Sequence, residues 1–184
     1  MTLEDLVARL VTDLEAAGIP YMIVGSLASS YHGEPRMTRD VDAVIEPSPE
    51  ALGLLVGRLG DDGLYVDADA ARQALAERSQ FNVIDSATGW KLDLIIRKDR
   101  PFSREEFARR QPAELSTGPL HVATAEDTIL AKLEWAASGQ SERQLADAAG
   151  VVAVSGDRLD LEYLDRWAAE LGVQQLWQEL RPSG

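Results

Sequence analysis

The chain has 184 residues and a formal net charge of −13 at pH 7, with 45% hydrophobic and 27% charged residues. This composition is close to the globular average and excludes a disordered or collagen-like chain. The negative charge argues against a protein that coats nucleic acid through bulk electrostatics, because neutralising phosphates requires a basic surface. The sequence has no cysteine, which excludes disulfides, thiolate metal sites and a cysteine nucleophile.

The sequence also lacks the features of membrane insertion. No apolar run approaches the ~20 residues of a membrane-spanning helix. The N-terminal residues do not combine a basic region with an apolar one, as a signal peptide does. We therefore expect no membrane partner and a cytoplasmic location.

The first predicted element is an amphipathic helix, because apolar residues recur at helical spacing over 3–14 and Gly18 follows the run. A short, partly β-branched apolar segment at 21–24 is typical of a buried strand. Gly25-Ser26 interrupts the apolar pattern, and helical character resumes over 27–31.

Apolar and acidic residues alternate over 40–45, which predicts a strand, and a helix is expected over 49–60. A shorter helix is expected over 68–77. Two apolar segments, 81–84 and 92–96, flank a turn-rich link and predict a hairpin. The sheet is therefore expected to be mixed.

The pattern of the sequence changes from strand-like to helical near Ala123. Proline and glycine punctuate a short strand-like region over 112–119, and everything after Thr124 has helical spacing. We therefore divide the chain into a core at 1–123 and a helical part at 124–184. Helices are expected around 124–135, 144–152, 161–171 and 173–180.

Three aspartates lie within apolar strand segments: Asp40 and Asp42 in one, Asp93 in another. Alternate residues of a strand lie on one face, so Asp40 and Asp42 project side by side, roughly 6–7 Å apart at Cα. Asp93 completes the cluster if its strand is a neighbour. Clustered buried carboxylates are costly unless a cation pairs with them, and Mg²⁺ prefers carboxylate and phosphate oxygens. The sequence therefore predicts a magnesium site.

Gly25 and Ser26 are the second group of candidate site residues, beside the three aspartates. Thirteen residues separate Ser26 from Asp40. Glycine lets the chain turn sharply, and the N-terminus of the following helix offers free N–H groups to an anion. We expect a triphosphate to bind here, with the Ser26 hydroxyl as a further donor. Simple capping of the helix by Ser26 is compatible with this role.

The combination of Gly25-Ser26, Asp40-Val41-Asp42 and Asp93 resembles the motif of the nucleotidyltransferase superfamily, which is Gly-Gly/Ser, a spacer, Asp-x-Asp and a third Asp. Within it, the segments YMIVGSLA (21–28) and RMTRDVD (36–42) are similar to AbiEii/AbiGii-type toxin-like proteins. The resemblance implies an α+β (mixed α/β) fold, with a mixed β-sheet flanked by helices and a helical C-terminal subdomain.

The resemblance also implies roles for single residues. Asp40 and Asp42 would bind one or two Mg²⁺ ions, and Asp93 would assist them or activate the attacking hydroxyl. The Gly25-Ser26 turn would hold the triphosphate. In EDTILAKL (126–133), Lys132 would face the nucleotide phosphates. Asp147 is the nearest match to an acid that sometimes follows this lysine on the next helix, with a plain surface role as the alternative.

Other interpretations of these residues stay open from sequence. Asp40 and Asp42 could be solvent-facing strand residues, and Asp93 could be neutralised by Lys91 and Arg97 in a structural ion pair. Lys132 could be an ordinary surface lysine. Arg36 and Arg39 either contact phosphate or balance the acids. The basic stretch 97–110 either meets a phosphate chain or is a solvated loop and helix face.

The sequence thus predicts a magnesium-dependent nucleotidyltransferase that moves a nucleoside monophosphate from an NTP to a hydroxyl. By analogy the acceptor is a tRNA 3′ end or a protein, and a toxin role with a cognate antitoxin follows from the same analogy. One alternative is a catalytically inactive module of the same fold that binds a nucleotide or a protein. Another is an interaction protein whose acids are surface charge.

Overall fold

A computed structural model of the chain describes residues 2–38, 40–61, 63–116, 118–139 and 141–182. The chain divides into two compact units: Met1–Val24 with Thr38–Val122, and Gly25–Met37 with Ala123–Gly184. The segment Gly25–Met37 therefore interrupts the first unit in sequence and belongs to the second. These units do not test whether 1–123 and 124–184 are separate domains, so that division stays a prediction.

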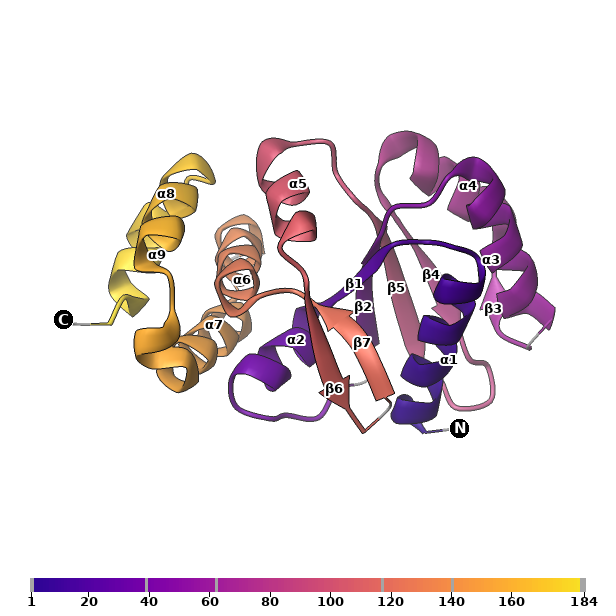
Figure 1. Cartoon of the computed structure of the whole chain (residues 1–184), viewed down its shortest axis with the longest axis horizontal. Coiled ribbons are helices and arrows are strands. Elements are labelled where there is room, and N and C mark those ends of the chain that lie inside the picture. The colour runs from indigo at the N-terminus through magenta and orange to yellow at the C-terminus, as the bar shows by residue number, and fades with distance from the viewer. Residues whose placement is uncertain (1, 39, 62, 117, 140, 183–184) are drawn as a thin grey trace. The chain divides into compact units, whose positions relative to one another are not determined.

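The described residues of the first unit form a seven-stranded mixed sheet (Figure 1). Its spatial order is β3-β4-β5-β2-β1-β7-β6. The pairs β2–β5 and β1–β7 are parallel, and the other neighbours are antiparallel. The strands are β1 (Tyr21–Val24), β2 (Asp40–Ile45), β3 (Tyr65–Val66), β4 (Gln80–Ile84), β5 (Lys91–Ile96), β6 (Gln111–Leu115) and β7 (Gly118–Val122). The predicted mixed sheet and the 81–96 hairpin are confirmed.

The helices of the first unit are α1 (Leu3–Ala16), α3 (Pro49–Asp61), α4 (Ala68–Glu77) and α5 (Pro101–Ala108). Helix α1 begins at a capping box, in which Thr2 and Asp5 satisfy each other's backbone N–H groups. Its apolar stripe, including Leu6, Leu10 and Leu14, is 0–1% exposed. The amphipathic pattern at 3–14 therefore marks a face that packs into the core.

The two faces of the central strands differ in polarity. Val41, Ala43 and Ile45 of β2 are fully buried, as are Leu92, Leu94 and Ile96 of β5 to within 2%. The opposite face of the same strands carries the acidic residues. Period-two alternation thus places the hydrophobic core on one side of β2 and β5 and frees the other side for polar chemistry.

The second unit is helical in its described residues. It contains α2 (Gly25–His32), α6 (Ala125–Gly139), α7 (Glu142–Ser155), the 3₁₀ turn η1 (Gly156–Arg158), α8 (Leu161–Glu170) and α9 (Gln174–Leu180). Helix α2 contacts both α6 and α7. Their shared core includes residues that are fully buried: Ala28, Ile129, Leu133, Ala148 and Val151. The helical C-terminal part expected from sequence is therefore present, and α2 joins it.

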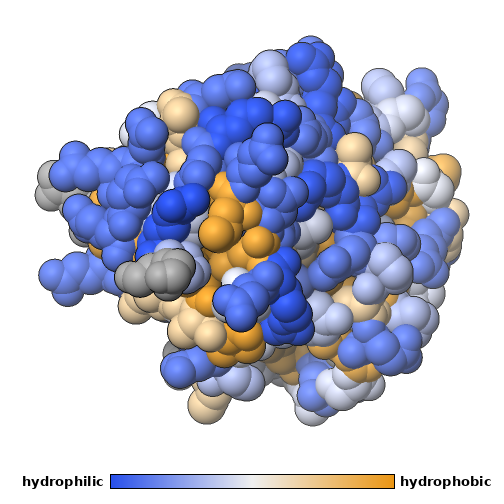
Figure 2. Space-filling view, turned by 60° about the vertical axis from the view of Figure 1, so that its left-hand side comes forward, coloured by the Kyte–Doolittle hydropathy of each residue, from blue (hydrophilic) through white to orange (hydrophobic). Residues whose placement is uncertain are grey.

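Figure 2 shows a mostly hydrophilic surface interrupted by a smaller hydrophobic area, in keeping with the acidic composition. Exposed large apolar side chains include Met37, Leu54, Tyr65 and Trp135. Isolated residues of this kind are common at protein surfaces. Within the described residues, none of the helices has both the length and the apolar character to cross a bilayer.

Candidate functional site

The acidic residues predicted from sequence are brought together by strand pairing in the first unit. On the parallel strands β2 and β5, Asp42 is the register partner of Asp93, and Asp40 is the register partner of Lys91. Partners on adjacent strands share a face, and so do residues two apart on one strand. Asp40, Asp42, Lys91 and Asp93 therefore lie on one face of the sheet, here called the acid face.

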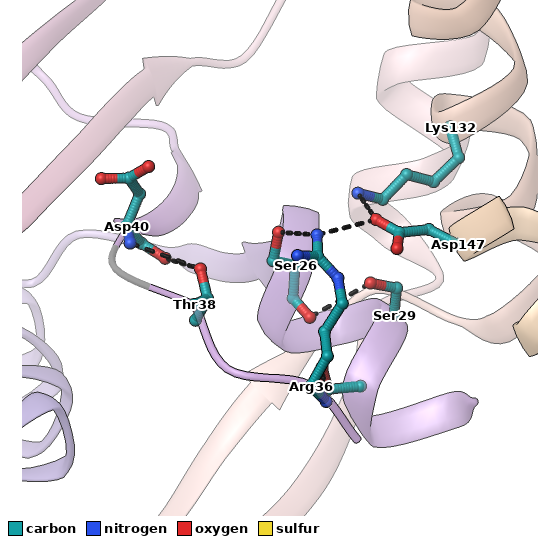
Figure 3. Close-up of polar contacts among 8 residues, drawn as sticks. Ser26, Ser29, Arg36, Thr38, Asp40, Lys132 and Asp147 are labelled. Carbon is teal, nitrogen blue, oxygen red and sulfur yellow. Dashed lines mark hydrogen bonds and ion pairs between the residues drawn. The ribbon is translucent and has the colours of Figure 1, made fainter. Parts of the chain in front are cut away.

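Burial increases along the acid face from Asp40 to Asp93. Asp40 is exposed, Asp42 is half-buried, and Asp93 is only 9% exposed. Thr38 fixes the start of β2, because its hydroxyl donates to the Asp40 carbonyl at 3.0 Å and accepts from the Asp40 N–H at 3.3 Å (Figure 3). The Asp40 carboxylate stands at the solvent-accessible edge of the acid face.

Asp93 has one paired and one unpaired oxygen. Its Oδ2 accepts a hydrogen bond from Lys91 Nζ at 2.8 Å. Its Oδ1 is buried and has no hydrogen-bond partner among the described residues. A buried carboxylate oxygen without a partner is costly, so this atom favours the approach of a cation or a proton donor.

The carboxylates keep the Lys91 ammonium charged. The hydrogen bond to Asp93 raises the pKa of Lys91; partial burial opposes this rise, and the charges of Asp93, Asp40 and Asp42 add to it. Arg97, the other cation considered as a neutraliser of Asp93, instead donates to Glu46 through its Nε at 2.9 Å. The structural ion pair considered from sequence thus exists with Lys91.

The acid face offers hard carboxylate donors of the kind that Mg²⁺ prefers. Among the described residues, no group of three or more His, Cys, Asp or Glu side chains is placed to hold a metal by itself. Mg²⁺ sites in phosphoryl-transfer proteins commonly use one or two carboxylates and complete the shell with water and substrate phosphates. Hard carboxylate donors and the unpaired Oδ1 of Asp93 agree with such a site.

The Gly25-Ser26 turn follows directly on β1, whose last residue, Val24, is the register partner of Asp42. Gly25 has a φ of 62°, a left-handed conformation that favours glycine. This conformation allows the chain to pass from strand to helix without an intervening loop. The first N–H groups of α2 lack partners within the helix, as at any helix N-terminus.

In the second unit, Ser26, Arg36, Lys132 and Asp147 form a hydrogen-bonded group, here called the cation cluster (Figure 3). Arg36 Nη2 donates to Ser26 Oγ at 2.7 Å and to Asp147 Oδ2 at 2.9 Å. Lys132 Nζ donates to the same Asp147 oxygen at 2.8 Å. One carboxylate oxygen therefore holds two cations from different segments of the chain.

The cation cluster is partly buried and carries a net positive charge. Lys132 is 5% exposed, so it is not an ordinary surface lysine, and the Asp147 side chain is 8% exposed. Burial works to raise the pKa of Asp147, but the hydrogen bonds and the charges of Lys132 and Arg36 together outweigh it and lower that pKa. Arg36 Nε is buried without a hydrogen-bond partner among the described residues. An anion would satisfy this N–H and balance the charge.

The predicted site residues other than Arg39 are divided between the two units. The first unit contains Asp40, Asp42 and Asp93, and the second contains Gly25, Ser26, Arg36 and Lys132. Arg39 lies outside the described residues. The catalytic and binding roles of these residues stay predictions. Sequence reasoning weighed Asp147 without adopting it, because nothing in the pattern of α7 signals that this acid is buried against Lys132.

The basic stretch 97–110 is largely engaged in local contacts. Arg104 pairs with Asp99 at 3.0 Å, and Arg110 donates to the Phe107 carbonyl at 2.7 Å. Arg100 Nε donates to Ser103 Oγ at 3.0 Å. This arrangement matches the solvated loop and helix face considered from sequence.

The chain was compared with known proteins by sequence and by structure. Neither a protein-family model nor a curated protein sequence matches it. The structure of ANT(2″)-Ia in complex with adenylyl-2″-tobramycin matches with 15% identity and a TM-score of 0.62, covering 95% of this chain and 99% of that chain. An antigenic nucleotidyltransferase-like protein from Paracoccidioides brasiliensis matches with 16% identity and a TM-score of 0.61, covering 97% and 91%.

The lincomycin-bound lincosamide antibiotic adenylyltransferase LnuA matches with 12% identity and a TM-score of 0.58, covering 84% of this chain and 98% of that chain. The fold is that of the nucleotidyltransferases. At these identities the likeness establishes the fold and not the activity. The narrower resemblance to AbiEii/AbiGii-type proteins stays a prediction.

Proposed function

We propose that this chain is a divalent-ion-dependent nucleotidyltransferase that transfers a nucleoside monophosphate from an NTP to a hydroxyl group. The observation that carries the proposal is the pairing of Asp42 with Asp93 on the acid face, together with the buried, unpartnered Oδ1 of Asp93. A fold shared with adenylyltransferases supports the same reaction class.

The acid face supplies the groups that act at the α-phosphorus. Asp40, Asp42 and Asp93 would hold one or two Mg²⁺ ions, which supply charge neutralisation and orientation of the triphosphate. Asp93 Oδ1 accepts the proton of the acceptor hydroxyl. The hydroxyl oxygen then forms a bond to the α-phosphorus, the bond to the bridging oxygen breaks, and pyrophosphate leaves.

The cation cluster supplies groups that suit phosphate oxygens. Arg36 and Lys132 give it a net positive charge, and Ser26 adds a hydroxyl. Asp147 holds the two cations on one oxygen, so that their positions are set before a ligand arrives. Through the nucleotidyltransferase resemblance, these cations would hold phosphate oxygens of the nucleotide, and preset cations stabilise such charge without reorganisation. If Arg39 also contacts phosphate, it would add to this charge.

The acceptor is the least constrained part of the proposal. The net charge of −13 disfavours a polyanionic acceptor such as tRNA unless a local basic surface receives it. A protein hydroxyl and a small molecule do not meet this repulsion. Two matched structures contain an adenylylated tobramycin and lincomycin. A toxin role with a cognate antitoxin remains part of the proposal through the AbiEii/AbiGii resemblance alone.

Binding and turnover can be separated in one experiment. Calorimetry with each NTP, with and without Mg²⁺, measures binding, and pyrophosphate release in the presence of total tRNA, lysate protein, tobramycin or lincomycin measures transfer. We expect Mg²⁺-dependent NTP binding and pyrophosphate release with one acceptor class. Binding without release would favour the inactive nucleotide-binding module.

A matched pair of variants connects either result to the acid face. Asp42→Asn removes a carboxylate from the acid face, whereas Asp99→Asn removes one from an exposed pair with Arg104. Only Asp42→Asn should abolish release. Equal release by the two variants would exclude the mechanism, and absence of NTP binding by the unmodified chain would favour a protein-interaction role.

A further inference from the structure

Lys91 occupies an unusual position among the carboxylates of the acid face. It begins β5, is the register partner of Asp40, and donates from Nζ to Asp93 Oδ2 at 2.8 Å. Its side chain is 35% exposed, whereas that of Asp93 is 13% exposed. The partly exposed Lys91 ammonium thus contacts Asp93, the most buried carboxylate of the acid face.

Charge balance explains why a cation is needed there. The acid face carries three carboxylates and one ammonium, and the mutual repulsion of the carboxylates grows as water is excluded. In the ion-free protein, Lys91 offsets part of this repulsion. A divalent ion at the unpaired Oδ1 would offset the same repulsion with twice the charge, so the ion and the Lys91 ammonium on Oδ2 would repel each other across one carboxylate.

We propose that Lys91 is an internal counter-ion of the divalent-ion site, which pairs with Asp93 when no ion is bound and loosens that pairing when an ion binds. This inference rests on the proposed function and deepens it, because it assigns a residue that sets the ion affinity of the acid face. The contact of Lys91 with Asp93 stabilises the ion-free protein, and the same contact weakens ion binding.

The side chain of lysine is suited to this exchange. A compact ammonium on a flexible four-carbon stem can leave one oxygen and reach water without disturbing the strand. The partial exposure of Lys91 gives it such a route.

The first test measures Mn²⁺ binding to the full chain by electron paramagnetic resonance, with Lys91→Met, Lys91→Arg and Lys98→Met beside the unmodified protein. Lys91→Met should bind Mn²⁺ about tenfold more tightly, since a competing charge is removed. Lys91→Arg keeps the charge and should bind like the unmodified chain. Lys98→Met removes the same charge from an exposed position after β5 and should change affinity less than about twofold.

A second readout uses stability. Without ion, Lys91→Met leaves Asp93 buried and unpaired, so its melting temperature should fall below that of the unmodified chain. Mg²⁺ should then raise the melting temperature of Lys91→Met by more than it raises that of the unmodified protein or of Lys98→Met. An equal Mg²⁺ shift in all three proteins would overturn the proposal.

A third readout needs no destabilised variant. The side-chain ammonium of Lys91 gives a ¹⁵N-correlated NMR signal when its exchange with water is slowed by a hydrogen bond, and Lys91→Arg identifies that signal by its loss. Addition of Mg²⁺ to the unmodified chain should shift or broaden it. A signal unchanged at saturating Mg²⁺ would show that Lys91 keeps Asp93, which contradicts the proposal.

Failure of this inference can be told from failure of the proposed function. If the unmodified chain and Lys91→Met bind Mn²⁺ with equal affinity, Lys91 is no counter-ion, while the transferase proposal stands. If neither protein binds Mn²⁺, the counter-ion proposal is excluded, while the transferase proposal is tested separately by NTP binding and pyrophosphate release. Binding by Lys91→Met alone would support the counter-ion and favour the inactive module over the enzyme.

Discussion

Asp42 and Asp93 are register partners on the parallel strands β2 and β5, although they are far apart in the sequence. Parallel pairing puts both carboxylates on the face of the sheet opposite the apolar core formed by Val41 and Leu92. Two like charges at adjacent positions destabilise a sheet unless a cation is shared between them. Lys91 supplies one such cation through its contact with Asp93, and we propose that a divalent ion supplies another.

This relationship predicts opposite effects of Asp42→Asn on stability and on activity. Removal of one of three neighbouring carboxylates relieves repulsion, so the ion-free variant should melt at the same temperature or slightly higher. Nucleotidyl transfer should fall by more than about 100-fold, because the change removes a proposed metal ligand. Differential scanning calorimetry and a pyrophosphate assay test the two halves. A variant that melts lower and keeps its activity would assign Asp42 a structural role.

A second prediction concerns the pair of Lys132 and Asp147. Asp147→Ala leaves Lys132, 5% exposed, without the carboxylate that it contacts at 2.8 Å. Loss of one partner of a buried ion pair should lower the free energy of unfolding by about 3 kcal/mol. Urea denaturation measures this change. As a control, Asp99→Ala in an exposed pair should cost less than about 1 kcal/mol.

Substitution of both partners provides a further check on the same pair. Lys132→Met combined with Asp147→Leu replaces buried charges by apolar groups of similar size, so it should cost less than Asp147→Ala alone. A double variant that is less stable than Asp147→Ala would argue that Arg36, not Lys132, depends most on this carboxylate.

A third prediction rests on Gly33, which follows α2. A Cβ at this position would lie 2.9 Å from the Ser29 carbonyl oxygen and 2.9 Å from the Val151 backbone nitrogen. Backbone atoms cannot yield easily, so Gly33→Ala should destabilise the protein by about 1–3 kcal/mol. Gly53→Ala is the matched control: it lies on an exposed part of α3 with open space around its Cα, and should stabilise by about 0.5–1 kcal/mol.

Chemical denaturation measures the change in the free energy of unfolding for Gly33→Ala and for Gly53→Ala. Equal changes for Gly33→Ala and Gly53→Ala would mean that the close approach of α2 to α7 is relaxed in solution. A loss confined to Gly33→Ala would confirm that α2 packs on α7 within the second unit.

A fourth prediction concerns pH and His32. Burial lowers the pKa of His32 below its usual 6.5, against the opposing effects of the Ala123 carbonyl and Glu126. The folded protein therefore binds this proton less readily than the unfolded chain, and stability contributed by neutral His32 is present above pH 6.5 and lost as the pH falls below it. His32→Gln keeps a donor for the Ala123 carbonyl and cannot titrate.

The measurement compares unfolding of the two proteins at about pH 7.5 and about pH 5.5, on either side of the ordinary histidine pKa. The unmodified chain should lose more stability on acidification than His32→Gln, since other groups titrate equally in both. The same loss in the two proteins would show that His32 accepts its proton without cost in the folded state.

Much of the fold could be predicted because its signals are local. The apolar stripe of α1, the alternation in β2 and the turn-rich link between β4 and β5 each specify their own element. Other features depend on distant partners. The two-residue strand β3 has no periodicity of its own, and only its pairing with β4 defines it. The membership of Gly25–Met37 in the second unit likewise follows from tertiary contacts.

The candidate site also combines features that the local sequence predicts with features that depend on distant residues. The alternation in 40–45 predicted that Asp40 and Asp42 share a face, because side-chain direction in a strand has a period of two. The pairing of Asp42 with Asp93 required knowledge of strand order, which periodicity does not contain. The burial of Lys132 was also hidden, because a lysine is buried only when a partner such as Asp147 accepts its charge.

The most direct test of the central claim follows the phosphorus atoms of the NTP. The full chain is incubated with Mg²⁺, an acceptor mixture, and NTP labelled at either the α- or the γ-phosphate. We predict that α-label enters the acceptor, that γ-label appears only in pyrophosphate, and that Asp42→Asn and Asp93→Asn abolish both. Transfer of γ-label to an acceptor, or undiminished α-transfer by these variants, would contradict this claim.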